Sequence, residues 1–413
     1  MTETSGPQRR LAAAGVIPYA LAVGGMVLAW QIVIQPYIER APVEAAIRIA
    51  PTSPLVLRRA AESELAAGRN DNAAALSRDA LSRAPFDVKA LRVVGLTEAK
   101  AGRLDEANEI LTLAGNWSLR DDPTHAWLVE HRLRRGDYAS AFAHADTLAR
   151  RRGDLQPPTF RLFTLAATRD PQRVLPVLTD LLAIRPPWRP GYLTSLYEAD
   201  GSLPVAANLA VLLQSTPAPL TTTELQEFYA NAMAQRQVGI IKTVRARLNR
   251  PASGSAVTNG RFDDPTAPEP FQWSLVQKSG AVAEAMTDEL RPSNPALRVE
   301  YDGYSAAVIA HQRVFLAPGA HHLRFQFRIE SGEPTDRMGW NITCDPGGRS
   351  ILSSSAVPVT GAGAWTSSAV KFSVPEGCPS QLLELRGRAL DNRKPMVVWF
   401  DEVAIDAFKP TPN

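Results

Sequence analysis

Residues 321–330 read HHLRFQFRIE, and this stretch decides the fold of the C-terminal part of the chain. Apolar and polar side chains alternate along it, and the apolar set is Leu323, Phe325, Phe327 and Ile329. Successive side chains of a β-strand point to opposite faces, so a period of two predicts a strand with one buried face. Similar runs recur nearby as ALRVEY, GWNITC, AVKFSVP, LLELRGR and MVVWFDEVAID, separated by Gly and Pro turns. About nine to eleven such runs predict an antiparallel β-sandwich or jelly roll over residues 258–408.

The composition changes upstream of this region, at residues 251–256, which read PASGSA. Small residues with Pro and Gly form short linkers, so we expect a linker at residues 251–257. Residues 41–250 are rich in Ala, Leu and Arg and have helical periodicity. This pattern predicts an all-α domain ahead of the sandwich.

Three glycines recur in the predicted helical domain with a spacing of 34 residues, at Gly68, Gly102 and Gly136. A polar turn follows each glycine, and an alanine stands five residues after it, at Ala73, Ala107 and Ala141. A turn glycine adopts a positive φ without steric cost, and small alanines let paired helices approach closely. The pattern resembles the tetratricopeptide repeat family. This resemblance implies an α-solenoid whose concave face binds a peptide or a partner protein.

The landmarks of the C-terminal region follow a familiar order. The region opens with NGRFD at residues 259–263 and PFQW at 270–273, and it closes with VWFDEV at 398–403. This order resembles the galactose-binding-like jelly roll of family 4/9 carbohydrate-binding modules. The resemblance implies a glycan-binding fold in which Asp263 and Asp401 help to hold a structural calcium ion. The alternative is that both acids cap turns or pair with arginines.

Sugar recognition needs an aromatic ring that stacks on a pyranose and polar side chains that bind its hydroxyl groups. The candidate residues are Tyr304, Arg324, Gln326, Arg328, Trp340, Asn341 and Trp365. Two arginines and an amide on one strand face favour an acidic sugar, because guanidinium binds carboxylate in a bidentate manner. The alternative is that the tryptophans belong to the core and that the arginine face is solvated.

An uncharged stretch near the start of the chain bears on its location. Residues 11–34 read LAAAGVIPYALAVGGMVLAWQIVI, and Arg9 and Arg10 precede them. At ~1.5 Å per residue, a helix of this length spans the ~30 Å hydrocarbon layer of a bilayer. We therefore expect a cytoplasmic tail at 1–10, an uncleaved transmembrane anchor at 11–35 and a periplasmic remainder, as in a single-pass bacterial inner-membrane protein. A cleaved signal peptide and a buried soluble helix are the alternatives.

The chain has two cysteines, Cys344 and Cys378, and both lie in the predicted sandwich. In an oxidising compartment they can pair, so the predicted periplasmic location favours a disulfide between them. No Cys-x-x-Cys is present, and the histidines lack the spacing of a zinc site. We expect no cofactor beyond the structural calcium ion.

The sequence carries no established catalytic motif of the serine hydrolase, zincin or P-loop type. Its 45 basic and 42 acidic residues give a net charge of +3, without the concentrated basic surface that nucleic-acid binding needs. We therefore expect a non-enzymatic, membrane-anchored periplasmic scaffold. It would bind a partner protein through its repeats and a glycan through its sandwich, in polysaccharide assembly or export. The alternatives are a glycan-binding accessory subunit and an enzyme with a cryptic carboxylate site.

Overall fold

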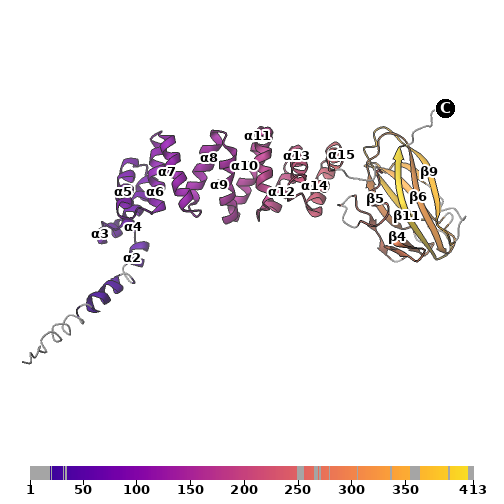
Figure 1. The fold of residues 1–413 in the computed structure, drawn as a ribbon, viewed down its shortest axis with the longest axis horizontal. Coiled ribbons are helices and arrows are strands. Elements are labelled where there is room, and N and C mark those ends of the chain that lie inside the picture. The colour runs from indigo at the N-terminus through magenta and orange to yellow at the C-terminus, as the bar shows by residue number, and fades with distance from the viewer. Residues whose placement is uncertain are drawn as a thin grey trace, which may run out of the picture. The chain divides into compact units, whose positions relative to one another are not determined.

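The computed structural model describes residues 19, 21–30, 32, 35–248, 255–264, 268, 271–278, 280–304, 306–334, 337–353, 363–388 and 391–407. Contacts between residues divide the chain into two compact units, 1–155 and 156–413. The first unit is helical, and the second contains further helices followed by a β-sandwich (Figure 1). A helical region followed by a sandwich is the order that the sequence predicts.

The prediction of a transmembrane helix is wrong. No helix among the described residues is both long and apolar enough to cross a bilayer. The single-pass topology with a periplasmic remainder depended on that helix and is withdrawn with it. Residues 1–18, 20, 31, 33 and 34, which include the predicted cytoplasmic tail, lie outside the described residues.

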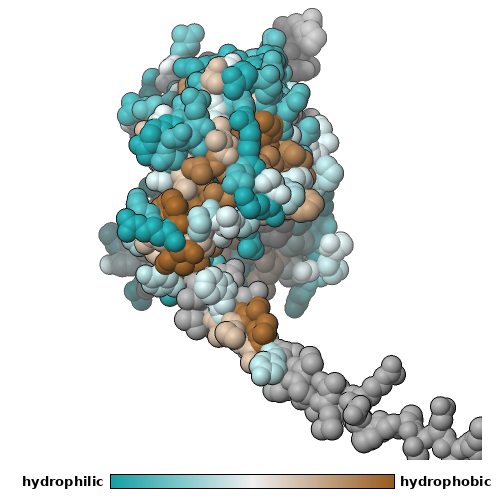
Figure 2. Space-filling view, turned by 90° about the vertical axis from the view of Figure 1, so that its left-hand side faces the viewer, coloured by the Kyte–Doolittle hydropathy of each residue, from teal (hydrophilic) through white to brown (hydrophobic). Residues whose placement is uncertain are grey.

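The first unit continues with helices that pack in sequential pairs. Their bounds are α2 (Gln35–Arg40), α3 (Val43–Ile49), α4 (Pro54–Ala66), α5 (Asn70–Arg83), α6 (Val88–Lys100), α7 (Leu104–Trp117), α8 (Asp122–Arg134) and α9 (Tyr138–Arg151), followed by the 3₁₀ turn η2 (Gly153–Leu155). The pairs α4–α5, α6–α7 and α8–α9 are in contact, and α5 and α7 also contact the helix that follows them. Where α2 and α3 lie, apolar side chains remain uncovered among polar ones (Figure 2).

The turn within each pair is made by a glycine. Gly68, Gly102 and Gly136 have φ of 77°, 84° and 71°, where an L side chain is strained. The paired helices then approach closely because small residues lie between them. A Cβ atom built on Gly95 of α6 would stand 2.6 Å from Cγ of Leu111 on α7, so any other residue there would force the buried Leu111 side chain to shift.

The second unit begins with six helices that depart from this glycine pattern. They are α10 (Gln156–Arg169), α11 (Pro171–Ala183), α12 (Arg189–Glu198), α13 (Leu203–Gln214), α14 (Thr222–Ala234) and α15 (Val238–Arg247). The chain turns after α11 at Arg185 and after α14 at Arg236, which have φ of 50° and 58° without being glycines. Arg189 joins α12 to α14, because its buried guanidinium donates to both carboxylate oxygens of Glu224 at 2.9 and 2.8 Å.

The sandwich consists of two antiparallel sheets. Its strands are β1 (Ser274–Leu275), β2 (Gln277–Lys278), β3 (Ala281–Asp288), β4 (Arg291–Tyr301), β5 (Val308–Val314), β6 (Gly319–Ser331), β7 (Met338–Asp345), β8 (Ser350–Ser353), β9 (Thr366–Val374), β10 (Ser380–Gly387) and β11 (Met396–Ala407). One sheet has the order β1-β5-β10-β7-β8, and the other has the order β2-β3-β4-β11-β6-β9. Strand β11 lies between β4 and β6, so strands that are distant in sequence are neighbours in this sheet.

Both sheets turn their apolar side chains toward one shared core. The four apolar residues of β6 that the alternation predicts to be buried all lie in it. Trp340 on β7 is fully buried there, with its ring centroid 5.9 Å from that of Phe325 and 5.7 Å from that of Phe400. Cys344 and Cys378 form a disulfide with their Cα atoms 5.4 Å apart, as the sequence predicts.

Candidate functional site

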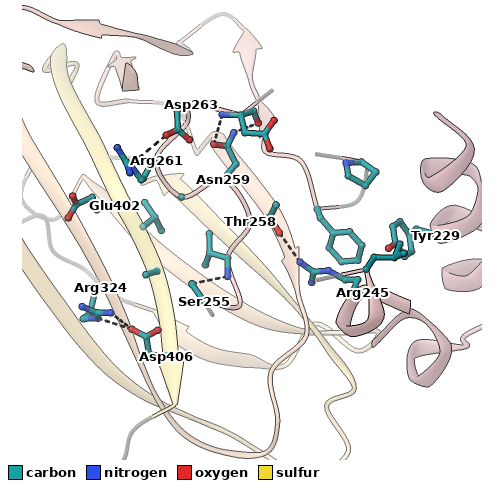
Figure 3. A pocket seen from close by; sticks show the side chains of 18 of the residues that line it. Tyr229, Arg245, Ser255, Thr258, Asn259, Arg261, Asp263, Arg324, Glu402 and Asp406 are labelled. Carbon is teal, nitrogen blue, oxygen red and sulfur yellow. Dashed lines mark hydrogen bonds and ion pairs between the residues drawn. The ribbon is translucent and has the colours of Figure 1, made fainter. Parts of the chain in front are cut away.

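A cleft of about 690 Å³ opens in the second unit, where α14 and α15 meet the first segment of the sandwich (Figure 3). Tyr229 and Arg245 line it from these helices, and residues 257–261 line it from the opening segment. Strand β6 contributes Arg324, and strand β11 contributes residues 402–404 and Asp406. The cleft therefore combines parts of the chain that lie far apart in sequence.

The opening segment is held against β11 by a close backbone contact. A Cβ atom on Gly260 would stand 1.9 Å from the carbonyl oxygen of Val403, so glycine is required at this position. The Gly260 carbonyl accepts from the Val403 N–H at 2.9 Å. Asn259, with φ of 51°, closes the turn by pairing its side chain with both backbone groups of Asp264 at 2.5 and 2.9 Å. The opening and closing landmarks of the sequence thus lie side by side.

A bulge in β11 directs Glu402 into the cleft. The pairing of β11 with β6 shifts between Asp401 and Ala404, and Glu402 has φ of 51°. The Asp401 carboxylate accepts the Glu402 N–H at 2.7 Å, which stabilises this conformation. The Glu402 carboxylate in turn accepts from Nε2 of Gln326 at 2.6 Å.

Two exposed ion pairs provide hydrogen-bonding groups at the cleft. Nε of Arg324 donates to Asp406 at 2.9 Å, and the two side chains are 60% and 37% exposed. Nε of Arg261 lies 3.6 Å from Asp263. Each pair presents charged donors and acceptors to a solute, although exposed pairs of this kind add little to stability.

Arg245 forms a different part of the wall. It is 7% exposed, its guanidinium carbon lies 3.7 Å from the ring centroid of Phe271, and Nη2 donates to the hydroxyl of Thr258 at 2.7 Å. The ring of Tyr229 packs edge-on against the ring of Phe271, with the two centroids 4.8 Å apart. Burial lowers the pKa of Arg245 to about 10, so the side chain remains charged at neutral pH.

The polar face of β6 is paired within the protein. Besides the Arg324–Asp406 pair, Arg328 donates to both oxygens of Asp288 at 3.0 and 2.6 Å, and Gln326 accepts from Arg291 at 2.5 Å. Arg328 and Asp288 are both buried. The predicted solvated or sugar-facing arginine row is therefore a set of ion pairs and hydrogen bonds between strands.

The aromatic candidates do not form a platform around the cleft. Trp340 lies in the core and cannot stack on a ligand. Trp365 donates its indole N–H to Asp288 at 2.8 Å, and the guanidinium carbon of Arg291 lies 4.1 Å from the centroid of its ring. Tyr304 is 47% exposed, with Arg393 5.5 Å from its ring centroid.

Asn341 lies on β7 of the five-stranded sheet, in register with Glu384 of β10. Among the seven candidates and within the described residues, only Arg324 lines the cleft.

The two acids expected to hold calcium lie in different surroundings. Asp401 is buried, and its oxygens accept hydrogen bonds from Arg291 at 3.1 Å and from the Glu402 N–H. Burial raises the pKa of Asp401. Asp263 faces the cleft and pairs with Arg261. In the part of the chain that the structure describes, no three acidic, histidine or cysteine side chains gather as metal ligands.

Sequence reasoning missed Tyr229, Arg245 and Glu402. Glu402 follows a strand pattern, and only the bulge shows that it faces the cleft. Arg245 stands among other arginines of a helix that precedes the predicted linker, so no local signal connects it to the sandwich. The NGRFD motif offered a partial signal, because its glycine and turn residues form one wall.

Comparison with known proteins finds no family model that matches the chain and no match among curated proteins. Solved structures give matches to parts of it. A CBM4 structure is 14% identical and covers 36% of this chain and 97% of its own, with a TM-score of 0.27. The CBM22-1 xylan-binding domain from Paenibacillus barcinonensis Xyn10C is 13% identical, covers 33% of this chain and 85% of its own, and has a TM-score of 0.25. MamA AMB-1 is 16% identical, covers 49% of this chain and 94% of its own, and also scores 0.25. At these identities and scores the likenesses carry no argument about function.

Proposed function

We propose that this chain is a non-enzymatic binding protein that takes up a glycan in the cleft beside α15 and a partner protein along its helical repeats. The observation that carries the glycan part is the cleft of about 690 Å³, which lies within the ~300–1,000 Å³ usual for small-ligand sites. Its rim carries the Arg324–Asp406 and Arg261–Asp263 pairs. Sugar hydroxyl groups both donate and accept hydrogen bonds. In each pair the arginine can donate to a hydroxyl group and the aspartate can accept from one.

The walls of the cleft favour hydrogen bonding over ring stacking. The rings of Tyr229 and Phe271 are almost wholly buried in the wall, so neither offers an open face to a pyranose. We therefore expect modest affinity, with specificity set by the hydroxyl pattern of the ligand.

Affinity electrophoresis and calorimetry of the full chain against a panel of neutral and acidic polysaccharides test this proposal. For a bound glycan, Arg324→Ala and Asp406→Asn should each weaken binding about fivefold to tenfold, because each removes charge-assisted hydrogen bonds. Arg298→Ala is the matched control, since Arg298 pairs with Glu300 on β4 away from the cleft. Absence of binding to every glycan, or equal losses in all three variants, would contradict the glycan role.

A glycan-active enzyme is the second candidate, because four acidic residues line the cleft. They are Asp263, Asp264, Glu402 and Asp406. Glycoside hydrolysis uses two carboxyl groups that flank the scissile bond. Release of reducing ends by the wild-type chain, abolished in Glu402→Gln, would establish an enzyme and overturn the non-enzymatic proposal.

The protein-binding part of the proposal is supported by the helical repeats and by an exposed aromatic pair on them. Phe86 and Trp117 follow α5 and end α7, their ring centroids are 5.5 Å apart, and they are 81% and 44% exposed. Exposed aromatic residues are enriched at protein-binding surfaces. With a glycan ligand as well, we propose polysaccharide assembly or export as the setting. Photo-crosslinking from residue 86, with exposed Glu109 as the control position, tests the surface, and equal adducts from both positions would count against it.

A further inference from the structure

The buried arginines of the second unit differ in how their charge is satisfied. Arg189 and Arg328 each donate to both oxygens of a carboxylate, and Arg337 donates to two backbone carbonyls and one side-chain amide oxygen. Arg245 is as deeply buried as these, yet among the described residues it donates only to the neutral hydroxyl of Thr258. No described carboxylate forms an ion pair with it.

A buried guanidinium without a counter-charge is costly, because the protein interior solvates a charge poorly. The other two guanidinium nitrogens, Nε and Nη1, have no hydrogen-bond partner among the described residues, and neither is fully buried. They therefore reach the open cleft, which Arg245 lines. Phe271 covers one face of the guanidinium and Thr258 holds one edge, so the group is fixed before any ligand arrives.

We infer that Arg245 is the anchor for an anionic substituent, a carboxylate or a sulfate, of an acidic glycan bound in this cleft. The inference rests on the proposed glycan function and names the ligand class of the same site. A planar guanidinium with a free edge binds such an oxyanion in a bidentate manner. Arg261 and Arg324 serve this role less well, because each is already paired with an aspartate. Those two pairs remain available for the sugar hydroxyls.

The test compares ligands that differ only in charge. Binding of the full chain is measured calorimetrically with trigalacturonate, with its carboxyl-reduced trisaccharide and with a sulfated form of the reduced trisaccharide. We expect at least one anionic ligand to bind about tenfold or more tightly than the reduced one, as a charge-assisted bidentate contact implies. The two anionic arms distinguish carboxylate from sulfate as the substituent.

Variants assign the preference to Arg245. Arg245→Met should bring the anionic and neutral ligands to about equal affinity, while Arg245→Lys should retain part of the preference because it keeps the positive charge. Arg298→Met controls for loss of one positive charge outside the cleft and should keep the wild-type preference. If Arg245→Met unfolds, as thermal unfolding would reveal, Arg245→Lys and Thr258→Val carry the comparison.

The outcomes separate the two proposals. An unchanged anionic preference in Arg245→Met, or in both Arg245→Lys and Thr258→Val, overturns the anchor. Equal binding of all three ligands by the wild type also overturns it and leaves the glycan function standing. If no glycan of any kind binds, both proposals fail together.

Discussion

At the scale of single residues, one histidine pair joins two helices of the first unit. Nδ1 of His125 on α8 lies 2.9 Å from Nδ1 of His144 on α9, and Nε2 of His125 lies 3.2 Å from the carbonyl oxygen of Ser118. Burial lowers the pKa of both rings, to about 4 for His144. One Nδ1 must donate to the other, so the contact requires at least one neutral ring.

This pair makes the first unit sensitive to acid. Because the folded-state pKa of His144 lies below its ordinary value of 6.5, the unfolded chain binds more protons between pH 4 and 6.5. Stability is therefore greatest above pH 6.5 and falls as the pH drops toward 4. We expect His144→Gln to reduce this loss by roughly 1–2 kcal/mol, less than the full shift implies because the ring is partly solvated. Urea unfolding at pH 7 and pH 4.5 measures it, and an unchanged difference between the two pH values would refute the assignment.

Residue-level prediction from the sequence succeeded for burial and failed for partners. The alternation of β6 correctly separates the buried Phe325 and Phe327 from the exposed Arg324, although Arg328 on the polar face is also buried. The acids that neutralise the two arginines come from β3 and β11 and stand 40 and 82 residues away in sequence. Local periodicity contains no information about which distant acid pairs with which arginine. The polar face of β6 was therefore predicted to be solvated or sugar-binding.

At the scale of elements, the turns decide how far a repeat can be seen in sequence. In the first unit the turns use glycine with positive φ, which leaves a 34-residue pattern. In the second unit a glycine, Gly201, takes that conformation between α12 and α13, whereas Arg185 and Arg236 take it after α11 and α14. An arginine at a turn adds nothing to a glycine repeat, so the helices after residue 156 were predicted from composition and helical periodicity without a turn glycine every 34 residues.

The turn glycines provide a direct test of this account. Gly102 has no atom near its missing Cβ, so Gly102→Ala costs only the strain of a positive φ. We expect a loss of about 1 kcal/mol in the free energy of unfolding. Gly153→Ala is the matched control, because Gly153 also faces open space and lacks a positive φ. Thermal unfolding of both variants measures the difference, and equal stability would show that backbone strain is absent at Gly102.

At the scale of the whole molecule, the chain consists of two contact units whose division at residue 155 differs from the composition change near residue 251. Composition reports secondary structure, whereas the contact division reports which elements share packing. Helices α10–α15 resemble the earlier helices in composition, yet they belong with the sandwich. Hydropathy of the uncharged N-terminal stretch predicted a membrane span, whereas no helix among the described residues is long and apolar enough to form one.

Two units predict separable unfolding events in the full chain. The Cys344–Cys378 disulfide closes a loop of 34 residues in the second unit, and such a cross-link contributes about 3–4 kcal/mol in the chain-entropy description. Calorimetry of Cys344→Ala/Cys378→Ala should lower one transition, whereas Gly102→Ala should lower the other. A single transition that moves with either change would contradict independent units.

The contact of Arg245 and Tyr229 with Phe271 has a practical consequence for dissecting the chain. A fragment cut at the PASGSA stretch would leave Phe271 bare, and it would take away the helical wall of the cleft. Such an excised sandwich would expose apolar surface and would tend to aggregate in solution. A fragment that starts at Gln156, by contrast, carries every residue that the ligand-binding proposals invoke.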